Sequence, residues 1–92
     1  MSPLVGLVIH RRALKNLAGI PAKIGAQLIK KAKGLILEPF PDGAIQLRGI
    51  VSDCDEPIYR IRSGDYRILY VVRKNPSEVI VLDIDNRKDV YR

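Results

Sequence analysis

A short apolar run near the start of the chain, Leu4-Val5-Gly6-Leu7-Val8-Ile9, predicts a buried first strand, although so short a run also fits a turn of helix. The pattern of apolar positions then becomes helical. Between Arg11 and Ala18, the apolar side chains that recur at helical spacing are Ala13, Leu14 and Leu17. Gly19 is expected to end this first helix.

A second helix is predicted from about Pro21 to Leu37, because proline is favourable in a first helical turn and an apolar stripe follows it. The stripe consists of Ile24, Leu28, Ala32 and Leu35, and the lysines largely off it are Lys23, Lys30 and Lys33. The segment Glu38-Pro39-Phe40-Pro41-Asp42-Gly43 ends the helix, and we predict a loop from there to about Pro57. The two helices should form a hairpin.

The second half of the chain has a strand-like pattern. Ile58–Arg62 and Tyr66–Val72 flank a tight turn at Gly64-Asp65, which is typical of a β-hairpin. A third strand, Val79–Ile84, follows a second turn, and the short connections make these strands antiparallel. The sequence therefore predicts one α+β domain over residues 1–92: an N-terminal strand, a helical hairpin and a three-stranded antiparallel meander, forming one sheet packed on the helices.

A two-residue turn at Gly64-Asp65 fixes the register of the whole hairpin. One face then carries Tyr59, Ile61, Ile68 and Tyr70, a coherent surface for the helices to cover. The other face carries three arginines, Arg60, Arg62 and Arg67, with Arg62 directly opposite Arg67.

Two arginines directly across a hairpin repel one another, at a cost of roughly a few tenths to 1 kcal/mol, so a sequence selected for stability alone should avoid them. An anion bound between them would reverse the sign of the interaction. The arrangement therefore points to a phosphate-binding surface. The alternative is an ordinary solvated face, on which Asp65, Asp83 or Asp85 neutralises the arginines through ion pairs.

The net charge of +6 is in keeping with a polyanionic partner, since clustered Lys and Arg release counterions from phosphates. The excess lies in the N-terminal half. Residues 1–52 carry eight basic side chains against Glu38 and Asp42 alone, whereas residues 53–92 carry eight of each sign. A catalytic cluster in the second half must therefore come from local placement of arginines.

Other kinds of chemistry find little support in the sequence. His10 is the only histidine, and the only cysteine, Cys54, lies between two aspartates that disfavour its thiolate. These two residues do not make a zinc site, no glycine-rich phosphate loop is present, and no cofactor is expected. Because no N-terminal apolar run is long enough for export or membrane insertion, we expect a cytoplasmic protein with no membrane partner.

The last residues, Asn86-Arg87-Lys88-Asp89-Val90-Tyr91-Arg92, form a basic segment with one aromatic side chain. Arginine binds phosphate bidentately, and a tyrosine can stack on a base or, beside cations that draw off its proton, act as a base. The alternative is a frayed polar terminus with Tyr91 against the sheet edge.

Taken together, these segments resemble the RelE/ParE superfamily of toxins from bacterial and archaeal toxin–antitoxin pairs. The resemblance covers the whole chain and rests on Ala13-Leu14-Lys15-Asn16-Leu17, Leu47-Arg48-Gly49, the hairpin from Tyr59 to Arg67, and the closing segment, which points to the RelE branch. It implies the toxin of a type II system, a ribosome-dependent endoribonuclease that cuts messenger RNA in the ribosomal A site without a metal. The 2′-hydroxyl attacks the adjacent phosphate, giving a 2′,3′-cyclic or 3′-phosphate and a 5′-hydroxyl.

The resemblance also implies a role for each catalytic residue. Arg60 and Arg62 would hold the phosphate and stabilise the transition state, and Arg67 would bind it from the facing strand. Arg87 would assist the leaving 5′-oxygen, and Tyr91 would activate the 2′-hydroxyl or stack on a base. The best-known RelE pattern has lysines at the positions of Arg60 and Arg62. A guanidinium, with a pKa above about 12, is a poor proton shuttle, so these two should act electrostatically.

Several further residues are expected to bind RNA: Lys23, Lys30, Lys31, Lys33, Arg48 and Lys88. An ordinary solvated helix face is the alternative for the lysines of the second helix. The expected partners are a cognate antitoxin that lays an acidic or helical segment over the basic cleft and helices, the ribosome with its mRNA, and operator DNA only through the antitoxin complex. The alternative function is a ParE-like toxin that binds DNA gyrase, or a degenerate member that binds only antitoxin and operator DNA.

Overall fold

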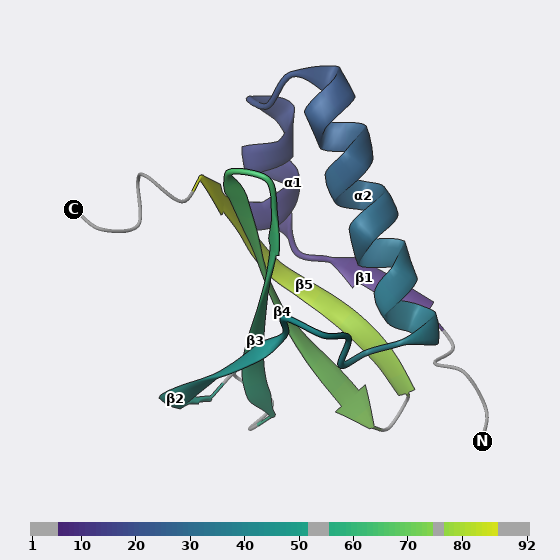
Figure 1. Cartoon of the computed structure of the whole chain (residues 1–92), viewed down its shortest axis with the longest axis vertical. Coiled ribbons are helices and arrows are strands. Elements are labelled where there is room, and N and C mark those ends of the chain that lie inside the picture. The colour runs from purple at the N-terminus through teal and green to yellow at the C-terminus, as the bar shows by residue number, and fades with distance from the viewer. Residues whose placement is uncertain (1–5, 52–55, 75–76, 87–92) are drawn as a thin grey trace.

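The computed structural model describes residues 6–51, 56–74 and 77–86, with the backbone alone for residues 48–51. The chain begins with strand β1 (Gly6–Ile9) and continues through helix α1 (Arg11–Ala18) and helix α2 (Ala22–Leu37) (Figure 1). The later strands are β2 (Ile45–Val51), β3 (Pro57–Ser63), β4 (Tyr66–Lys74) and β5 (Ser77–Asn86).

Both helices begin where the sequence favours a helix start. His10 precedes α1, and its Nδ1 accepts a 3.2 Å hydrogen bond from the backbone N–H of Arg12, which satisfies one donor of the first turn. Pro21 precedes α2, as expected. His10 is exposed and has a structural role. Within the described residues, neither helix combines the length and apolar character needed to span a membrane.

The strands form one sheet in the order β1-β5-β4-β3-β2. β1 lies at one edge, parallel to β5, with Gly6 opposite Glu78, and the chain between them runs through both helices and the other three strands. The prediction of a buried first strand was wrong, because at this edge Val8 is 42% exposed and the other residues of β1 are only partly buried. The α+β class and the antiparallel meander of β3, β4 and β5 are confirmed, with β5 extending beyond the predicted strand at both ends.

The loop predicted between α2 and Pro57 was wrong in part, because residues 45–51 of it form strand β2. β2 pairs with β3 through Ile45 opposite Arg60 and Gln46 opposite Tyr59, and the register then shifts before Val51. As an edge strand with an irregular register and a glycine inside it, β2 depends on the neighbouring strand more than on its own residue pattern.

The hydrophobic core lies between the helices and one face of the sheet (Figure 1). The predicted sheet face is confirmed, since Ile61, Ile68 and Tyr70 are buried and Tyr59 packs against them. The helices contribute the buried side chains of Ala13, Leu28, Ala32 and Leu35. The predicted stripe of α2 is therefore the face that it buries.

The predicted buried face of α1 needs one correction. Leu14 is 53% exposed, whereas Ala13 is buried and Leu17 packs against the core. Asn16 occupies the same face at helical spacing and hydrogen-bonds to β5. A polar side chain thus replaces the expected leucine where α1 meets the sheet.

An aromatic row ties the loop after α2 to the middle of the sheet. The ring centroids of Phe40 and Tyr59 lie 4.8 Å apart, and those of Tyr59 and Tyr70 lie 5.9 Å apart. The hydroxyl of Tyr70 donates a 2.7 Å hydrogen bond to the carbonyl of Pro39. Burial, with a smaller effect from Tyr59, raises the pKa of Tyr70 to about 12, so this hydroxyl remains a donor at neutral pH.

Candidate active site

The candidate site is the face of the β3–β4 hairpin that points away from the helices. The chain turns at Gly64-Asp65, where Gly64 has a φ of 60°, in the left-handed region that glycine adopts readily. The register is the one predicted, with Arg62 opposite Arg67. Because side chains alternate along a strand, Arg60 shares this face with both of them. The fold therefore brings the three arginines together.

Arg60 lies within the sheet, between Ile45 of β2 and Leu69 of β4. Its Nε is buried and has no hydrogen-bond partner among the described residues. A buried donor without an acceptor costs about 1–3 kcal/mol, and more when it is charged. An oxygen of a bound anion would satisfy this donor and remove that cost.

Arg62 and Arg67 differ in their surroundings although they face one another. Arg62 is exposed, whereas Arg67 is only 7% exposed and has interactions within the chain. Arg67 also lies opposite Asp85 of β5 in the register. A guanidinium that is already held in place loses little side-chain freedom when it binds a ligand. The pair thus combines one accessible cation with one fixed cation.

The aspartates considered as ion-pair partners are placed unequally. The Oδ1 of Asp83 accepts a 2.6 Å hydrogen bond from Nδ2 of Asn16, on α1, and a 2.8 Å hydrogen bond from the N–H of Ile84. Asp65 is exposed in the hairpin turn. Only Asp85 of these three lies across from an arginine of the hairpin face. Asp83 is therefore engaged with a helix, and the ion-pair alternative fits Asp85 alone.

Among the other predicted site residues, those whose side chains the structure describes do not lie on this face. Lys23, Lys30, Lys31 and Lys33 are exposed on α2, and Arg48 belongs to β2 without a described side chain. The remaining predictions concern residues outside the described ranges: Arg87, Lys88 and Tyr91, together with Cys54. The final pair of the sheet joins Tyr66 to Asn86, the residue directly before Arg87.

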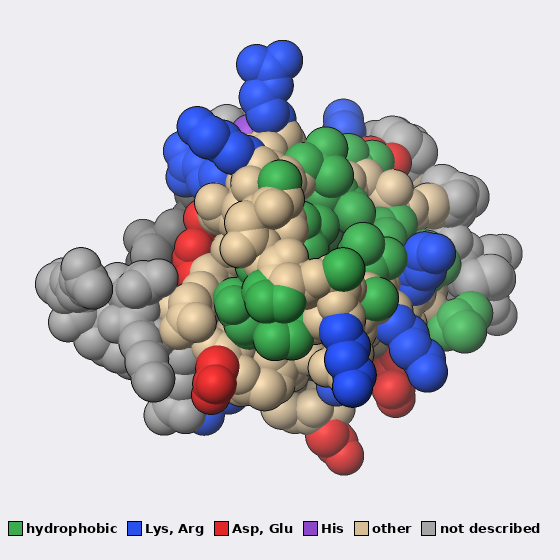
Figure 2. Space-filling model, turned by 90° about the horizontal axis from the view of Figure 1, so that it is seen from above, with side chains coloured by type: hydrophobic (Ala, Val, Ile, Leu, Met, Phe, Trp, Pro, Cys, Tyr) green, Lys and Arg blue, Asp and Glu red, His purple; other side chains and the backbone are tan. Residues whose placement is uncertain are grey.

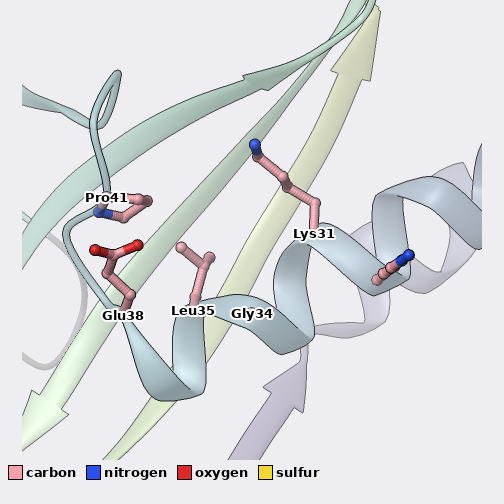
Figure 3. Close-up of a pocket in the computed structure, with 6 residues that line it drawn as sticks. Lys31, Gly34, Leu35, Glu38 and Pro41 are labelled. Atoms are coloured by element: carbon pink, nitrogen blue, oxygen red, sulfur yellow. The ribbon is translucent and has the colours of Figure 1, made fainter.

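Seen from the helical end, the Lys and Arg side chains stand in separate groups around hydrophobic surface (Figure 2). A mainly apolar cavity of about 320 Å³ lies along the C-terminal part of α2, lined by Lys30, Lys31, Gly34, Leu35, Glu38 and Pro41. In Figure 3, Lys31, Leu35, Glu38 and Pro41 surround this hollow. An apolar floor with charged groups at its rim suits a protein segment better than a phosphate backbone.

A second, polar cavity of about 260 Å³ lies between the end of α1 and the ends of β4 and β5, lined by Asn16, Gly19, Ile20, Tyr66, Ile84, Asp85 and Asn86. The sequence reasoning did not single out Asn16. The pattern did contain a pointer to it, because Asn16 is the polar residue on the face defined by Ala13 and Leu17.

Comparison with known proteins agrees with this architecture. The model of a family described as the ParE toxin of type II toxin-antitoxin systems, parDE, matches residues 7–91. A Methanocaldococcus jannaschii protein named as a toxin, RelE1, is 30% identical over 91% of each chain. Toxin RelG of Mycobacterium tuberculosis is 31% identical over 87% of each chain.

Solved structures give the same answer. The chain is similar to one in the archaeal RelE–RelB complex from Pyrococcus horikoshii, with a TM-score of 0.75, 26% identity, and coverage of 91% of this chain and 96% of the other. A chain of the RelBE2 toxin–antitoxin complex of Mycobacterium tuberculosis also gives a TM-score of 0.75, at 25% identity, with 94% and 100% covered. The family match spans nearly the whole sequence and coincides with a shared fold. The chain therefore belongs to the RelE/ParE family and is a toxin of a type II toxin–antitoxin system.

Proposed function

We propose that this toxin is a ribosome-dependent endoribonuclease that cuts messenger RNA in the ribosomal A site. The observation that carries the proposal is the arginine face, where Arg60, Arg62 and Arg67 converge from two adjacent strands. One of them, Arg60, has a buried donor without a partner among the residues that the structure describes. RNA supplies its own nucleophile, the 2′-hydroxyl, so the protein needs mainly to align it and to neutralise developing charge. The relatives named RelE1 and RelG support this assignment.

The arginines would act as fixed cations. Arg60 and Arg67 would hold the phosphate oxygens. The exposed Arg62 would add a third cation as negative charge grows around the pentavalent phosphorus. A guanidinium does not give up its proton in this reaction. Proton transfer from the 2′-hydroxyl therefore falls to Tyr91. Arg87 would stabilise the negative charge on the leaving 5′-oxygen, which takes its proton from water. Both residues belong to the segment that follows β5.

The same proposal includes a cognate antitoxin. The similar chains from Pyrococcus horikoshii and Mycobacterium tuberculosis come from complexes with RelB-type antitoxins. An inhibitor of this chain would lay an acidic or helical segment over the arginine face and the helices, because only that placement removes the cations from RNA. Antitoxin, ribosome and messenger RNA are all cytoplasmic partners, and operator DNA would be reached only through the antitoxin complex. An antitoxin that neutralised toxicity but left Arg60, Arg62 and Arg67 accessible would contradict this part.

The test is cleavage of a defined message on programmed ribosomes, mapped by primer extension. Wild type would be compared with Arg67→Ala and Arg87→Ala. The matched control is Arg73→Ala: Arg73 lies on the same strand and the same face as Arg67, but it pairs with Glu78 at 3.5 Å. Loss of one transition-state cation should lower the single-turnover rate by roughly 10²–10³-fold, whereas the control should cleave like wild type.

The outcomes separate the two candidate functions. Codon-positioned cuts by wild type that disappear in both arginine variants would support the proposal. The description of the matching family as the ParE toxin favours a second candidate, poisoning of DNA gyrase. Stabilised gyrase–DNA cleavage complexes, without any cut in the message, would favour that candidate and contradict ours. A chain that did neither but bound antitoxin and operator DNA would be a degenerate member.

A further inference from the structure

Asn16 joins helix α1 to the last part of strand β5. Its Nδ2 donates one hydrogen bond of 2.6 Å to Oδ1 of Asp83 and another of 3.2 Å to the carbonyl of Ile84. The same carboxylate oxygen accepts the N–H of Ile84 at 2.8 Å. These contacts are partly buried, where hydrogen bonds to a charged group are worth about 1.5–3 kcal/mol. We refer to Asn16, Asp83 and Ile84 as the clamp.

The clamp lies where β5 would otherwise lack an edge partner. β1 pairs with β5 only as far as Val81, whose carbonyl accepts the N–H of His10 as the chain turns into α1. Beyond that point no strand of the described part of the chain pairs with β5 on this side, and Asn16 supplies a donor to the carbonyl of Ile84. An unpaired strand edge is free to bend or fray, so a side chain from a helix fixes its direction.

A bulge in β5 lies at the same point. Leu69 of β4 pairs with Asp83, whereas Tyr70 pairs with Val81, so Leu82 is an extra residue in β5. Bulges bend a strand and re-aim the residues that follow them. The bend is therefore followed at once by the clamp and then by the final pair of the sheet, Tyr66 with Asn86.

We propose that Asn16 is a positioning residue for catalysis. Through Asp83 and Ile84 it fixes the position of the end of β5, and with it that of Asp85, which lies opposite Arg67 of the arginine face. The inference rests on the proposed nuclease function. It places part of the control of the site on α1, on the side of the sheet away from the arginines.

The test exchanges the two side chains of the clamp. Asn16→Asp removes the donor and places a second carboxylate against Asp83. The double variant Asn16→Asp with Asp83→Asn restores the hydrogen bond between the two side chains with donor and acceptor exchanged, and Oδ1 of the new asparagine still accepts from the N–H of Ile84. It does not restore the donor to the carbonyl of Ile84, so only partial recovery is expected. Lys15→Ala, an exposed neighbour on the same helix, is the matched control. Such a cycle isolates the pair from the effect of either single change.

We expect Asn16→Asp to lower kcat for ribosome-dependent cleavage by roughly 10²-fold with KM nearly unchanged, since a misplacement of about 1 Å costs that much. The double variant should have a kcat at least tenfold above that of Asn16→Asp, and Lys15→Ala should have the kcat of wild type. Two results would overturn the inference. One is a wild-type kcat in Asn16→Asp. The other is a fall in kcat that is accompanied by a lower melting temperature, with neither recovering in the double variant.

Amide hydrogen exchange separates this inference from the proposed function. In Asn16→Asp, exchange should accelerate at Ile84, Asp85 and Asn86 and stay at the wild-type rate at Ile61 and Ile68. Should wild type cleave no RNA, the nuclease proposal fails, and the clamp is then judged by this pattern alone. Local acceleration would keep Asn16 as the residue that directs the end of β5, and uniform acceleration across the sheet would remove it from that role.

Discussion

The two faces of the β3–β4 hairpin come from the same two strands, whose side chains point alternately to one face and the other, yet the faces have opposite properties. Toward the helices, Ile68 and Tyr70 are completely buried, and the hydroxyl of Tyr70 has its acceptor. On the other face, Arg62 stands opposite Arg67, and Arg60 keeps a buried donor without a described partner. The first face stabilises the fold, and the second holds an arrangement that costs stability without a ligand. Each face can be tested against the other.

The largest effect is expected in the helix-facing core. Leu28 on α2 is fully buried, so Leu28→Ala should lower the free energy of unfolding by about 2–5 kcal/mol through lost burial and the cavity left behind. Leu14→Ala is the matched change, because Leu14 is half exposed on α1, and it should cost less than about 1 kcal/mol. Urea denaturation followed by circular dichroism measures both. Equal losses would mean that Leu14, and not Asn16, belongs to the buried face.

The second effect is a loss of stability at alkaline pH that depends on Tyr70. Its pKa is raised to about 12 in the folded chain, chiefly by burial, from the ordinary tyrosine value of 10.0. The unfolded chain therefore releases this proton first, and stability that is present below pH 10 is lost as the pH rises toward 12. The difference of about two pKa units corresponds to a loss of unfolding free energy on the order of 2–3 kcal/mol.

Tyr70→Phe isolates this contribution from the other groups that titrate at high pH. The variant should start less stable by about 1 kcal/mol, because the hydrogen bond to Pro39 is lost, and its stability should fall less steeply between pH 10 and 12. Chemical denaturation at a series of pH values provides the comparison. Parallel curves for wild type and variant would show that Tyr70 does not carry the alkaline loss.

A smaller effect of opposite sign is expected on the arginine face. Arg62→Gln removes the like charge opposite Arg67 and should raise the free energy of unfolding by a few tenths to about 1 kcal/mol, while lowering the cleavage rate. Thermal unfolding with and without inorganic phosphate sharpens the comparison, since phosphate should stabilise wild type more than the variant. A variant that was both less stable and fully active would refute the assignment of this face.

The smallest effect is expected at the other end of the same face. Arg73 and Glu78 form a cross-strand ion pair in which the arginine side chain is 44% exposed. Exposed pairs of this kind contribute about 0–1 kcal/mol, so Arg73→Gln should change stability little, and less still in high salt. Its melting curve is the baseline for that of Arg62→Gln. If Arg73→Gln raised the melting temperature as much as Arg62→Gln, the removal of any arginine from this face would be enough to stabilise the fold.

The hairpin could be predicted from the sequence because its information is local. A tight turn at Gly64-Asp65 fixes every pairing from Arg62 with Arg67 to Tyr59 with Tyr70, and alternation then divides core from arginine face. The stripe of α2 was readable for the same reason, as helical spacing places Leu28, Ala32 and Leu35 on one side.

What the sequence did not reveal depends on distant neighbours. β2 becomes a strand by pairing with β3, and its local pattern is broken by Gly49. Asn16 occupies a buried helical face because its partners are Asp83 and Ile84, at the far end of the chain. Asp83 was considered a partner for the arginines, and nothing local distinguishes that role from a hydrogen bond to a helix. Arg87 and Tyr91 remain predictions from family resemblance.

The position of β5 between β1 and β4 also bears on how the protein is made. Of the described strands, β1 leaves the ribosome before the others, but the strand it pairs with is made after them, since Gly6 lies opposite Glu78. Contacts between such distant segments close late, after the local hairpin and helices have formed. The nascent chain therefore lacks a completed sheet until its final strand emerges. A translating ribosome would accordingly carry an unfinished toxin until β5 has emerged from it.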